Sequence, residues 1–449
     1  MDDAKQLWAS WQSLLAAYGA DFTRPGWVRF VQWVTGTVLC HEEHTITQIL
    51  VGVGLEASWR NVEAFAEYGA WDRSAVERTT IQLIAAEQPA AHWGRYRVVA
   101  LDDTKEHRAS EKVWGVCTLH ESAARSPNRA ETVRVHNWVV AGDLLPGTPW
   151  RFLPHSARLY FRAKQLPAGE KFRKKTDLAV DLLRQENEAS ATPLVAVFDG
   201  AYANKTVVQS CLHPPAGERR IEVVTRLRFD ARLYEPLVKK PGVQGRPRTW
   251  GRRLPAPQHH AQWKKTPWRK GKALIYGRMR KFRYKQRVCR WSVSGANEPV
   301  QAFVFEVEGY DKPWYLVTTA LDLTTEEVVA LFAARFRQED AFRDLKQRLG
   351  MEECQAWTKE PILRTFQVQL VAMTLLRLLE DRIDAAWGEG SWWVVPDWNR
   401  HKCHPSVLDL RRLFGRSRAE VSQCLLQLDE IEKLPQQSSR RGKAAPRAA

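Results

Sequence analysis

The sequence predicts an α/β fold in which helices flank a mixed β-sheet, with a β-rich insertion, a helical N-terminal domain and a helical C-terminal region. Three observations support this prediction. Short apolar runs rich in β-branched residues alternate with amphipathic segments between residues 93 and 228. The chain before them has helical apolar spacing. A segment after them combines β-forming residues with Pro, Gly and many cations.

Residues 1–92 are predicted to form the helical N-terminal domain. Apolar residues recur with helical spacing in Trp27–Val38 and Ile46–Leu55, and Ser58–Phe65 begins a third helix. Thr45 stands where its hydroxyl can cap the second of these helices. Such a group of helices either packs on the core as a cap or serves as a separate binding or dimerisation domain.

The order of elements from residue 93 indicates the kind of sheet. Strands are expected at Tyr96–Leu101, Val113–Leu119 and Thr132–Ala141, and Arg158–Phe161 is either a further short strand or a turn. A helix, a strand, a second helix and another strand are then expected at Lys174–Asn187, Leu194–Phe198, Asn204–Cys211 and Ile221–Thr225. This β-β-β-α-β-α-β order is that of a ribonuclease H-like fold, whose sheet mixes antiparallel and parallel strands.

A basic insertion at residues 229–310 interrupts this core, which resumes at residues 311–352. Trp314–Thr319 predicts a strand, and Thr324–Leu349 predicts a long helix. The helix begins with a Thr-x-x-Glu capping box, and Gly350 stands where a left-handed residue ends a helix.

The rest of the chain is predicted to be helical and then disordered. Residues 353–435 form the helical C-terminal region, in which Pro361–Ala385 is apolar along one side. Residues 436–449 are expected to be a disordered basic tail.

The composition is that of a globular protein of the cytoplasm. The chain is 44% apolar and 27% charged, and none of its apolar runs reaches the ~20 uninterrupted residues of a membrane span. The first residues lack the basic-then-apolar order of a secretory signal. Seven scattered cysteines without CxxC spacing indicate reduced thiols. A membrane is therefore not expected among the partners.

The positive charge is concentrated in one segment. Residues 239–290 contain 18 Lys or Arg and no Asp or Glu, out of a net charge of +17 for the whole chain. Without this segment, 50 basic residues face 51 acidic ones. A cationic stretch confined to 52 residues is typical of a surface that contacts nucleic-acid phosphates.

Aromatic residues are interleaved with these cations. Flat rings beside phosphate-binding cations are typical of proteins that hold distorted or single-stranded nucleic acid. The same rings can equally be ordinary core packing, since large aromatics supply much of any core. The candidates are Trp250, Trp263, Trp268 and Trp291.

Three carboxylates stand where a metal-dependent phosphoryl-transfer enzyme needs them. Asp102 and Asp199 each follow a buried apolar strand, and Glu339 lies on the long helix. Carboxylates from separate elements can together hold two divalent ions ~4 Å apart for phosphodiester chemistry. An Asp after a strand is also common simply because it begins a turn.

The long helix places cations beside its glutamate. Phe332, Arg335, Glu339 and Lys346 lie along one helical face. Such cations can hold DNA phosphates on either side of a cut. The alternative is a solvated face with an Arg–Glu pair worth only ~0.3 kcal/mol.

These residues resemble the Y-(2)-R-(3)-E-(6)-K signature of a large group of bacterial insertion-sequence DDE transposases, which are cut-and-paste enzymes with a β-rich insertion before the glutamate. Asp102-Asp103-Thr104 looks like the first acidic motif of that group, and Asp199-Gly-Ala-Tyr202 looks like the second. The intervals of 97 and 140 residues match in kind, because the longer one contains the insertion. The resemblance covers roughly residues 95–350.

The resemblance implies a reaction and its partners. Two Mg²⁺ ions, for which Mn²⁺ can substitute, are held by Asp102, Asp199 and Glu339. Cleavage at transposon ends is followed by strand transfer into target DNA. The partners implied are double-stranded transposon-end DNA, target DNA and a second copy in a homodimeric synaptic complex. The location implied is the bacterial cytoplasm, with nucleoid association when the protein is bound to DNA.

The resemblance also suggests which residues contact DNA. Phe332, Arg335 and Lys346 belong to the signature, and the N-terminal helices would serve DNA-end binding or dimerisation. Relatives pass through a hairpin intermediate with a flipped base stacked on tryptophan, for which the four tryptophans above are candidates. The cations expected on end DNA are Arg278, Arg280, Lys281 and Arg283.

The sequence departs from the signature in two places. Phe332 replaces the tyrosine, so the hydroxyl and any hydrogen bond from it are lost. The first motif has two adjacent aspartates, whose side chains point to opposite faces of a strand. Asp102 fits the D-x-T form better, and Asp103 is the reserve choice.

Two other functions fit the same residues. A nuclease of this fold would use the same metal site and cut DNA without joining it. A domesticated transposase would keep only DNA binding. The carboxylates and their flanking cations argue against the second, since a pure binder has no need of an electrostatically costly acidic cluster.

Overall fold

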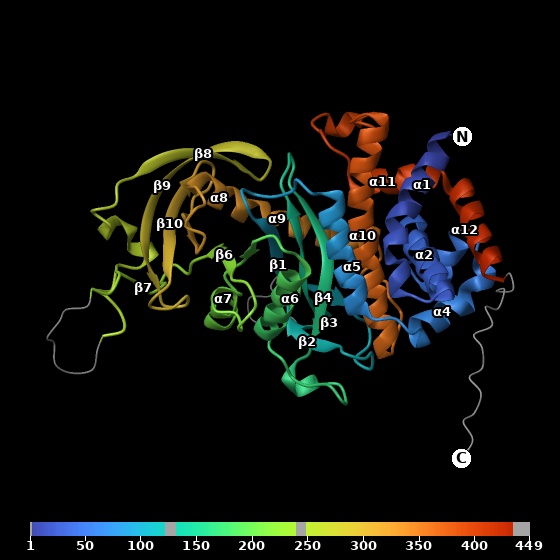
Figure 1. The fold of residues 1–449 in the computed structure, drawn as a ribbon, viewed down its shortest axis with the longest axis horizontal. Helices are drawn as coiled ribbons and strands as arrows, with labels where there is room; N and C mark the ends of the chain where they lie inside the picture. The colour runs from blue at the N-terminus through green and yellow to red at the C-terminus, as the bar shows by residue number, and fades with distance from the viewer. Residues whose placement is uncertain (1, 122–131, 239–247, 434–449) are drawn as a thin grey trace, which may run out of the picture.

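The computed structural model describes residues 2–121, 132–238 and 248–433. One continuous mixed sheet runs through the molecule, with helices on both of its faces and a helical body at one end (Figure 1). The expected basic tail at residues 436–449, and residues 239–247 of the basic segment, lie outside the described residues.

The central strands have the order of a ribonuclease H-like sheet, β4-β3-β1-β5-β6. Strands β1, β5 and β6 run parallel, whereas β3 is antiparallel to both β1 and β4. The α/β fold class is therefore confirmed. The strands are β1 (Arg97–His107), β2 (Cys117–His120), β3 (Thr132–Leu145), β4 (Arg151–Tyr160), β5 (Leu194–Phe198) and β6 (Ile221–Arg226).

Strand β1 is longer than the sequence pattern predicts. The expected strand ended at Leu101, but β1 runs to His107 because β3 pairs with it as far as His107 opposite Val135. Its parallel pairing with β5, in contrast, stops at Leu101 opposite Phe198. The strand therefore continues past the point at which one of its two neighbours ends. Strand β4 is also a full strand, where the sequence left open a short strand or a turn.

The insertion extends this same sheet. Strand β11 pairs with β6, β10 pairs with β11, and β9 pairs with β10, β8 and β7. The free edge that β6 would otherwise present to solvent is thus covered, which satisfies its backbone hydrogen bonds. The added strands are β7 (Leu233–Tyr234), β8 (Arg269–Ile275), β9 (Arg278–Trp291), β10 (Pro299–Val307) and β11 (Trp314–Thr318).

Helices cover the two faces of the sheet, and each face has its own hydrophobic core. Helices α6 (Lys175–Ala189) and α7 (Lys205–Leu212) pack on one face with Val99 and Leu101 of β1. Helices α8 (Thr325–Ala334) and α9 (Phe336–Arg348) pack on the other face with Val98 and Ala100. Residues of β1 therefore alternate between the two cores, as in any regular strand.

The predicted long helix is two helices joined at Arg335, whose backbone remains helical (φ −49°, ψ −30°). The predicted start and end are confirmed. Thr324 and Glu327 form the capping box, with the Glu327 carboxylate accepting from the Thr324 N–H at 2.7 Å. Gly350 has φ +67°, and a Cβ there would lie 2.2 Å from the Cβ of His44. Another residue at position 350 would therefore meet both backbone strain and a clash.

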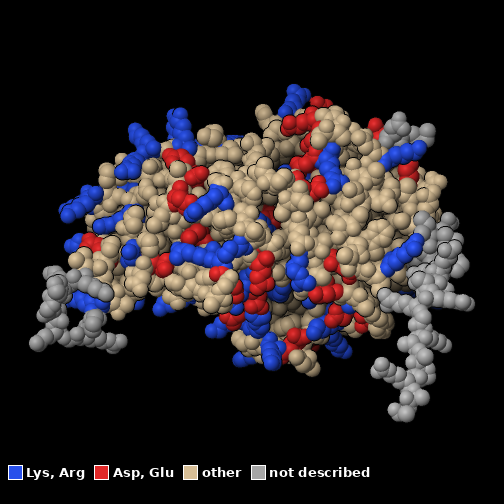
Figure 2. Space-filling model, in the orientation of Figure 1, with Lys and Arg blue, Asp and Glu red and all other residues tan. Residues whose placement is uncertain are grey.

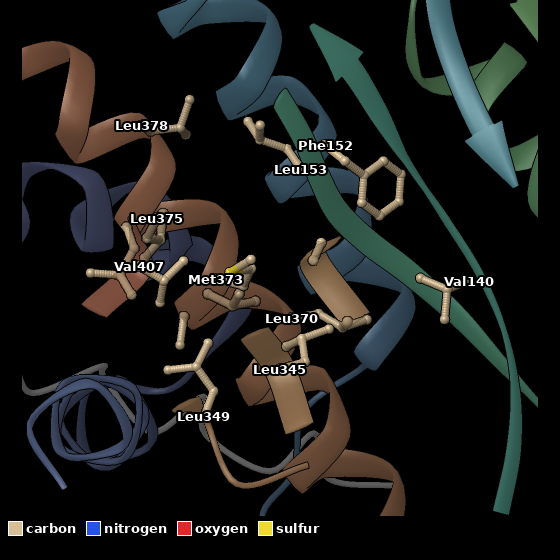
Figure 3. Close-up of a cluster of buried hydrophobic side chains, with 14 of the residues drawn as sticks. Val140, Phe152, Leu153, Leu345, Leu349, Leu370, Met373, Leu375, Leu378 and Val407 are labelled. Atoms are coloured by element: carbon tan, nitrogen blue, oxygen red, sulfur yellow. The ribbon is translucent and has the colours of Figure 1, made fainter. Parts of the chain in front are cut away.

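Helix α10 (Lys359–Trp387) is the central helix of the helical body, and it packs against β4 and the hydrophobic ends of α9 (Figure 3). It was expected to be apolar along one side, but it is buried almost all round between Pro361 and Leu376. It is long and apolar enough to cross a membrane, yet 94% of the relevant window is buried inside the protein. Its composition therefore reflects a core position.

The N-terminal and C-terminal helices form one body around α10. Helices α1, α2, α4 and α5 pack on α10, and α11 and α12 pack on α2. The predicted cap at Thr45 is confirmed, since its hydroxyl accepts from the Gln48 N–H at 3.3 Å. The bounds are α1 (Asp2–Ala16), α2 (Arg24–Leu39), α3 (Ile46–Val51), α4 (Trp59–Tyr68), α5 (Arg73–Glu87), α11 (Val407–Arg416) and α12 (Arg418–Lys433).

A buried charge network ties the sheet to the helices. The Arg97 guanidinium lies 2.5 Å from a carboxylate oxygen of Asp143 and 2.8 Å from one of Glu186. Burial alone would raise the pKa of Asp143, but Arg97 and His155 lower it to about 2. Because isolated buried charges are strongly unfavourable, this pairing fixes α6 against β1 and β3 close to the strand ends that carry the candidate site.

Candidate active site

Two of the predicted carboxylates lie side by side in the sheet. The parallel pairing of β1 and β5 ends with Leu101 opposite Phe198, and the next residue on each strand is Asp102 and Asp199. Leu101 and Phe198 belong to the same core, so the following residues both face the opposite side of the sheet, where α9 lies. The carboxyl ends of these parallel strands thus bring Asp102 and Asp199 together.

Strand alternation separates Asp102 from Asp103. The Asp103 side chain points to the α6 face, where its carboxylate accepts from the Tyr202 hydroxyl at 3.1 Å. The same carboxylate forms an ion pair with Lys175 of α6 at 2.7 Å. Asp103 therefore joins β1 to α6 and to the turn after β5, on the side of the sheet away from α9.

Arg335 connects Asp102 to Glu339. One guanidinium nitrogen donates to Asp102 Oδ2 at 2.7 Å, and the other lies 3.4 Å from Glu339 Oε1. The Arg335 side chain is 14% exposed, whereas that of Glu339 is 47% exposed. The three predicted carboxylates thus lie in one region, with the guanidinium of Arg335 between Asp102 and Glu339.

The other two signature residues lie at the margins of this region. The Arg335 guanidinium stands over the Phe332 ring at 5.9 Å, and that ring packs against Trp314. Lys346 lies two turns beyond Glu339 and pairs with Glu352 at 3.3 Å. The structure therefore places Phe332 against the arginine and Lys346 on a neighbouring carboxylate.

The electrostatics of Asp102 indicate a need for positive charge. Burial raises the pKa of Asp102 to about 7, Arg335 opposes that rise, and the nearby charge of Asp199 adds to it. Two carboxylates at the ends of adjacent strands repel one another, and the repulsion is relieved by a proton or by a cation. Arg335 supplies only part of that compensation.

The donor set suits a divalent cation such as Mg²⁺, which prefers carboxylate oxygens. In the described ranges, no three His, Cys, Asp or Glu side chains are gathered closely enough to hold a metal ion as they stand. The reason at this site is visible, because Arg335 lies between Asp102 and Glu339. The residues present fit the metal in kind, and their cationic neighbour now occupies part of the space between them.

The four predicted DNA-contacting cations of β9 are divided between the two faces of the sheet. Arg278 and Arg280 share the face of buried Phe282, and Arg280 donates to the Glu308 carbonyl. Lys281 and Arg283 point to the other face, where Arg283 pairs with Glu306 and stands over the Trp268 ring. They are therefore not one contiguous set.

The face with Lys281 and Arg283 carries cations directly opposite one another. Lys270 of β8 faces Arg283 of β9, and Lys272 faces Lys281. Like charges at directly opposed positions destabilise a strand pair, so the arrangement favours a role in binding a polyanion. Lys and Arg side chains are prominent on the β8–β9 end of the molecule in Figure 2. We call Lys270, Lys272, Lys281 and Arg283 the basic ladder.

The four candidate tryptophans have different surroundings. Trp263 and Trp291 are only 1% and 3% exposed and pack in the core of the α6 face, so packing replaces the stacking role expected for them. Trp250 and Trp268 are half-buried. Trp250 stacks on Tyr234 at 4.6 Å, and Trp268 lies under Arg283.

The sequence analysis missed Tyr276, which forms the tip of the β8–β9 hairpin. It has φ +49°, and its ring packs edge-on against Phe336 at 5.3 Å. Burial raises the pKa of Tyr276, and the charges of Glu339, Arg335 and Arg226 also act on it. The basic insertion therefore reaches the candidate site. A two-residue Tyr-Gly connection between strand patterns is the signal that could have identified this hairpin.

The fold and the site together define a class of enzyme. A ribonuclease H-like sheet with aspartates at adjacent strand ends, and a glutamate on a helix packed against them, is the arrangement of metal-dependent phosphodiester enzymes. A family model described as DDE superfamily endonuclease matches residues 19–287, more than half of the chain. The chain belongs to this family. No curated protein matches it at a significant level.

Membership in this family implies a DNA substrate and nuclease or transposase activity. The match includes Asp102 and Asp199 and most of the basic segment, and it ends before the helix that carries Glu339.

Proposed function

We propose that the protein is a DNA transposase of the Y-R-E-K group of bacterial insertion-sequence enzymes, in which Asp102, Asp199 and Glu339 are the catalytic carboxylates. The observation that carries the proposal is the register of β1 and β5, which sets Asp102 beside Asp199 on the face covered by α9. Membership in the DDE endonuclease family supports it, as does the contact of Arg335 with both Asp102 and Glu339.

Each of these residues has a distinct task in the proposed reaction. Asp102, Asp199 and Glu339 would hold two Mg²⁺ ions, or Mn²⁺ in their place. Bound there, the metal ions supply charge stabilisation and an activated oxygen nucleophile for attack on a phosphodiester. Arg335 would leave the carboxylates and pair with a DNA phosphate, for which a guanidinium is well suited. Lys346 would hold a second phosphate on the same helical face.

The chemistry proposed has two stages. Water attacks at the transposon end and frees a 3′-hydroxyl group. That hydroxyl then attacks a phosphodiester of target DNA, so that one bond forms as another breaks. A synaptic homodimer would bring the two ends together. The protein would work on double-stranded end DNA in the bacterial cytoplasm.

A strand-transfer assay tests this proposal against the nuclease alternative. Pre-cleaved linear ends with free 3′-hydroxyl groups are mixed with supercoiled target plasmid, protein and Mg²⁺. A transposase yields covalently joined products, and the same ends with 3′-dideoxy termini yield none. Cleavage of intact ends without joining of pre-cleaved ends would identify a nuclease that lacks strand transfer.

The basic ladder should supply part of the affinity for end DNA. We expect replacement of Lys270, Lys272, Lys281 and Arg283 by glutamine to weaken binding and to reduce the slope of log K against log salt. Each lost phosphate contact lowers that slope by about 0.9 for duplex DNA. Equilibrium binding between 50 and 200 mM salt, measured by fluorescence anisotropy, checks this.

The matched comparison is Arg278→Gln with Arg280→Gln on the other face of β9. Comparable losses from the two sets would show that DNA contacts both faces. An unchanged salt slope in the basic-ladder variant would place the DNA on another surface.

A further inference from the structure

A cation continues the row formed by the two aspartates. The parallel pairing of β5 and β6 ends with Phe198 opposite Thr225, so the residue of β6 beside Asp199 is Arg226. Arg226 is directly opposite Leu316 of β11, whose side chain belongs to the core of the α9 face. Asp102, Asp199 and Arg226 therefore lie in sequence across three adjacent strand ends and face the same side.

Arg226 is exposed, and its side chain makes no hydrogen bond or ion pair with another described residue. Its charge is felt by Tyr276 at the hairpin tip, together with those of Arg335 and Glu339. The remaining arginines of this neighbourhood have partners, because Arg335 contacts Asp102 and Arg228 pairs with Asp230 at 2.9 Å. Arg226 is thus an uncompensated charge beside the candidate catalytic site.

Arg226 borders a hollow of about 570 Å³ at this edge of the sheet. Gly200, which directly follows Asp199, forms one side of it, and Lys312 and Pro313 of the β10–β11 connection form another. Lys312 is exposed and, like Arg226, unpaired within the described part of the chain. The hollow therefore has two available cations and opens next to a candidate metal ligand.

An aromatic ring is held open to this hollow. Phe229 lines it and is 56% exposed. The loop that carries this ring is anchored on both sides, because Leu227 is buried and its N–H donates to the Tyr315 carbonyl at 2.8 Å. The Phe229 carbonyl in turn accepts from the Gln258 N–H at 2.9 Å. A large apolar ring kept in solvent by an anchored backbone calls for an explanation other than packing.

We propose that this hollow binds a nucleotide of the DNA strand next to the scissile phosphate, with Phe229 stacking on its base and Arg226 and Lys312 holding its phosphates. The inference rests on the proposed function, and it adds a substrate subsite outside the signature residues and the basic ladder. Cations for the backbone with a flat ring for the base are the chemistry by which proteins hold single strands. The nucleotide comes either from the transposon end or from the target strand, and the chemistry is the same for both.

The position of the hollow explains its use. A phosphodiester held at Asp102 and Asp199 has neighbouring nucleotides on either side, and the row of strand ends leads from Asp199 directly to Arg226. Acidic side chains alone would repel the flanking phosphates. Arg226 offsets that repulsion one strand away from the carboxylates, where it leaves their negative charge available for cations.

Fluorescence of 2-aminopurine tests the stacking. The base analogue is placed, one position at a time, within three nucleotides on either side of the cleavage site, in end DNA in one series and in target DNA in the other. Binding to wild-type protein with Ca²⁺, used to prevent turnover, should quench the fluorescence at one position, because an aromatic ring stacks on it. The series that responds identifies the source of the nucleotide.

Variants then assign the quenching to this hollow. Phe229→Ala should abolish it and weaken binding of the single-stranded segment by about 5-fold to 150-fold, the range of one base–aromatic stack. Phe172→Ala removes another exposed ring, 44% exposed and outside the hollow, and should leave the quenching unchanged. Arg226→Ala should lower the salt slope by about 0.7 for a single-stranded contact, and Arg226→Lys should restore it.

Two results would overturn the subsite. The first is the absence of quenching at every position in both series, and the second is equal quenching in wild type and Phe229→Ala. The test is separate from the proposed function, because Asp199→Asn should keep the quenching while cleavage is lost. If Asp199→Asn cleaves normally, the catalytic proposal fails whatever Phe229 does.

Discussion

Glu339→Gln is expected to reduce Mg²⁺-dependent cleavage and strand transfer by roughly 1,000-fold or more. Glutamine keeps the size of the side chain and one hydrogen-bonding oxygen but removes the charge that holds a divalent ion. Loss of metal-based charge stabilisation costs several kcal/mol in the transition state, and each 1.36 kcal/mol is a factor of ten in rate. Single-turnover cleavage of labelled end DNA measures the effect.

Binding separates chemistry from folding in this variant. End-DNA affinity should be kept or should rise, because Glu339 is nearly half exposed and its charge repels phosphate. Lys346→Ala, on the same helix, should show the reverse pattern of weaker binding and a smaller loss of rate at saturating DNA. If the Glu339→Gln variant cleaves at a near wild-type rate, Glu339 is an ordinary surface residue and the transposase proposal loses its centre.

Asp102→Asn should have an equally large effect, and Asp103→Asn is its matched control. The two variants make the same chemical change at adjacent positions on opposite faces of β1. Asp102→Asn removes a carboxylate beside Asp199, so cleavage should fall by about 1,000-fold or more. Asp103→Asn loses its ion pair with Lys175 and weakens its hydrogen bond with Tyr202, while the α9 face is untouched.

We therefore expect Asp103→Asn to lower the free energy of unfolding by about 1–3 kcal/mol, as for a charged hydrogen bond, and to keep cleavage within about tenfold of wild type. Urea denaturation and single-turnover cleavage give the two quantities. Equal loss of activity in both variants, with Asp103→Asn fully folded, would assign the metal to Asp103 or to both residues. The reverse pattern would show that the reserve choice is correct.

The sequence by itself determined the order of the elements and the residue types of the site. Continuous apolar runs fixed β5 and β6, helical spacing fixed α6 and α7, and the capping box with Gly350 fixed the limits of the α8–α9 segment. These features could be predicted because each depends on neighbours within a few residues. The concentration of cations in residues 239–290 is likewise a property of the chain alone.

The tertiary structure decided what depends on pairing between distant strands. Local pattern ended β1 at Leu101, but β3 prolongs it to His107, and this pairing is what assigns Asp102 and Asp103 to opposite faces of an ordered strand. The burial of Trp263 and Trp291, and the near-complete burial of α10, depend in the same way on partners that are far away in the sequence.

The region around the site followed the same division. Glu339 and Arg335 could be placed on one helical face from their spacing, because i and i+4 are neighbours on any α-helix. The contact of Arg335 with Asp102 joins residues 233 positions apart, and the row from Asp102 through Asp199 to Arg226 exists only because three parallel strands stop in register. A sequence pattern of period 2 or 3.6 specifies which face a side chain takes, whereas the register between strands is set by the packing of the whole sheet.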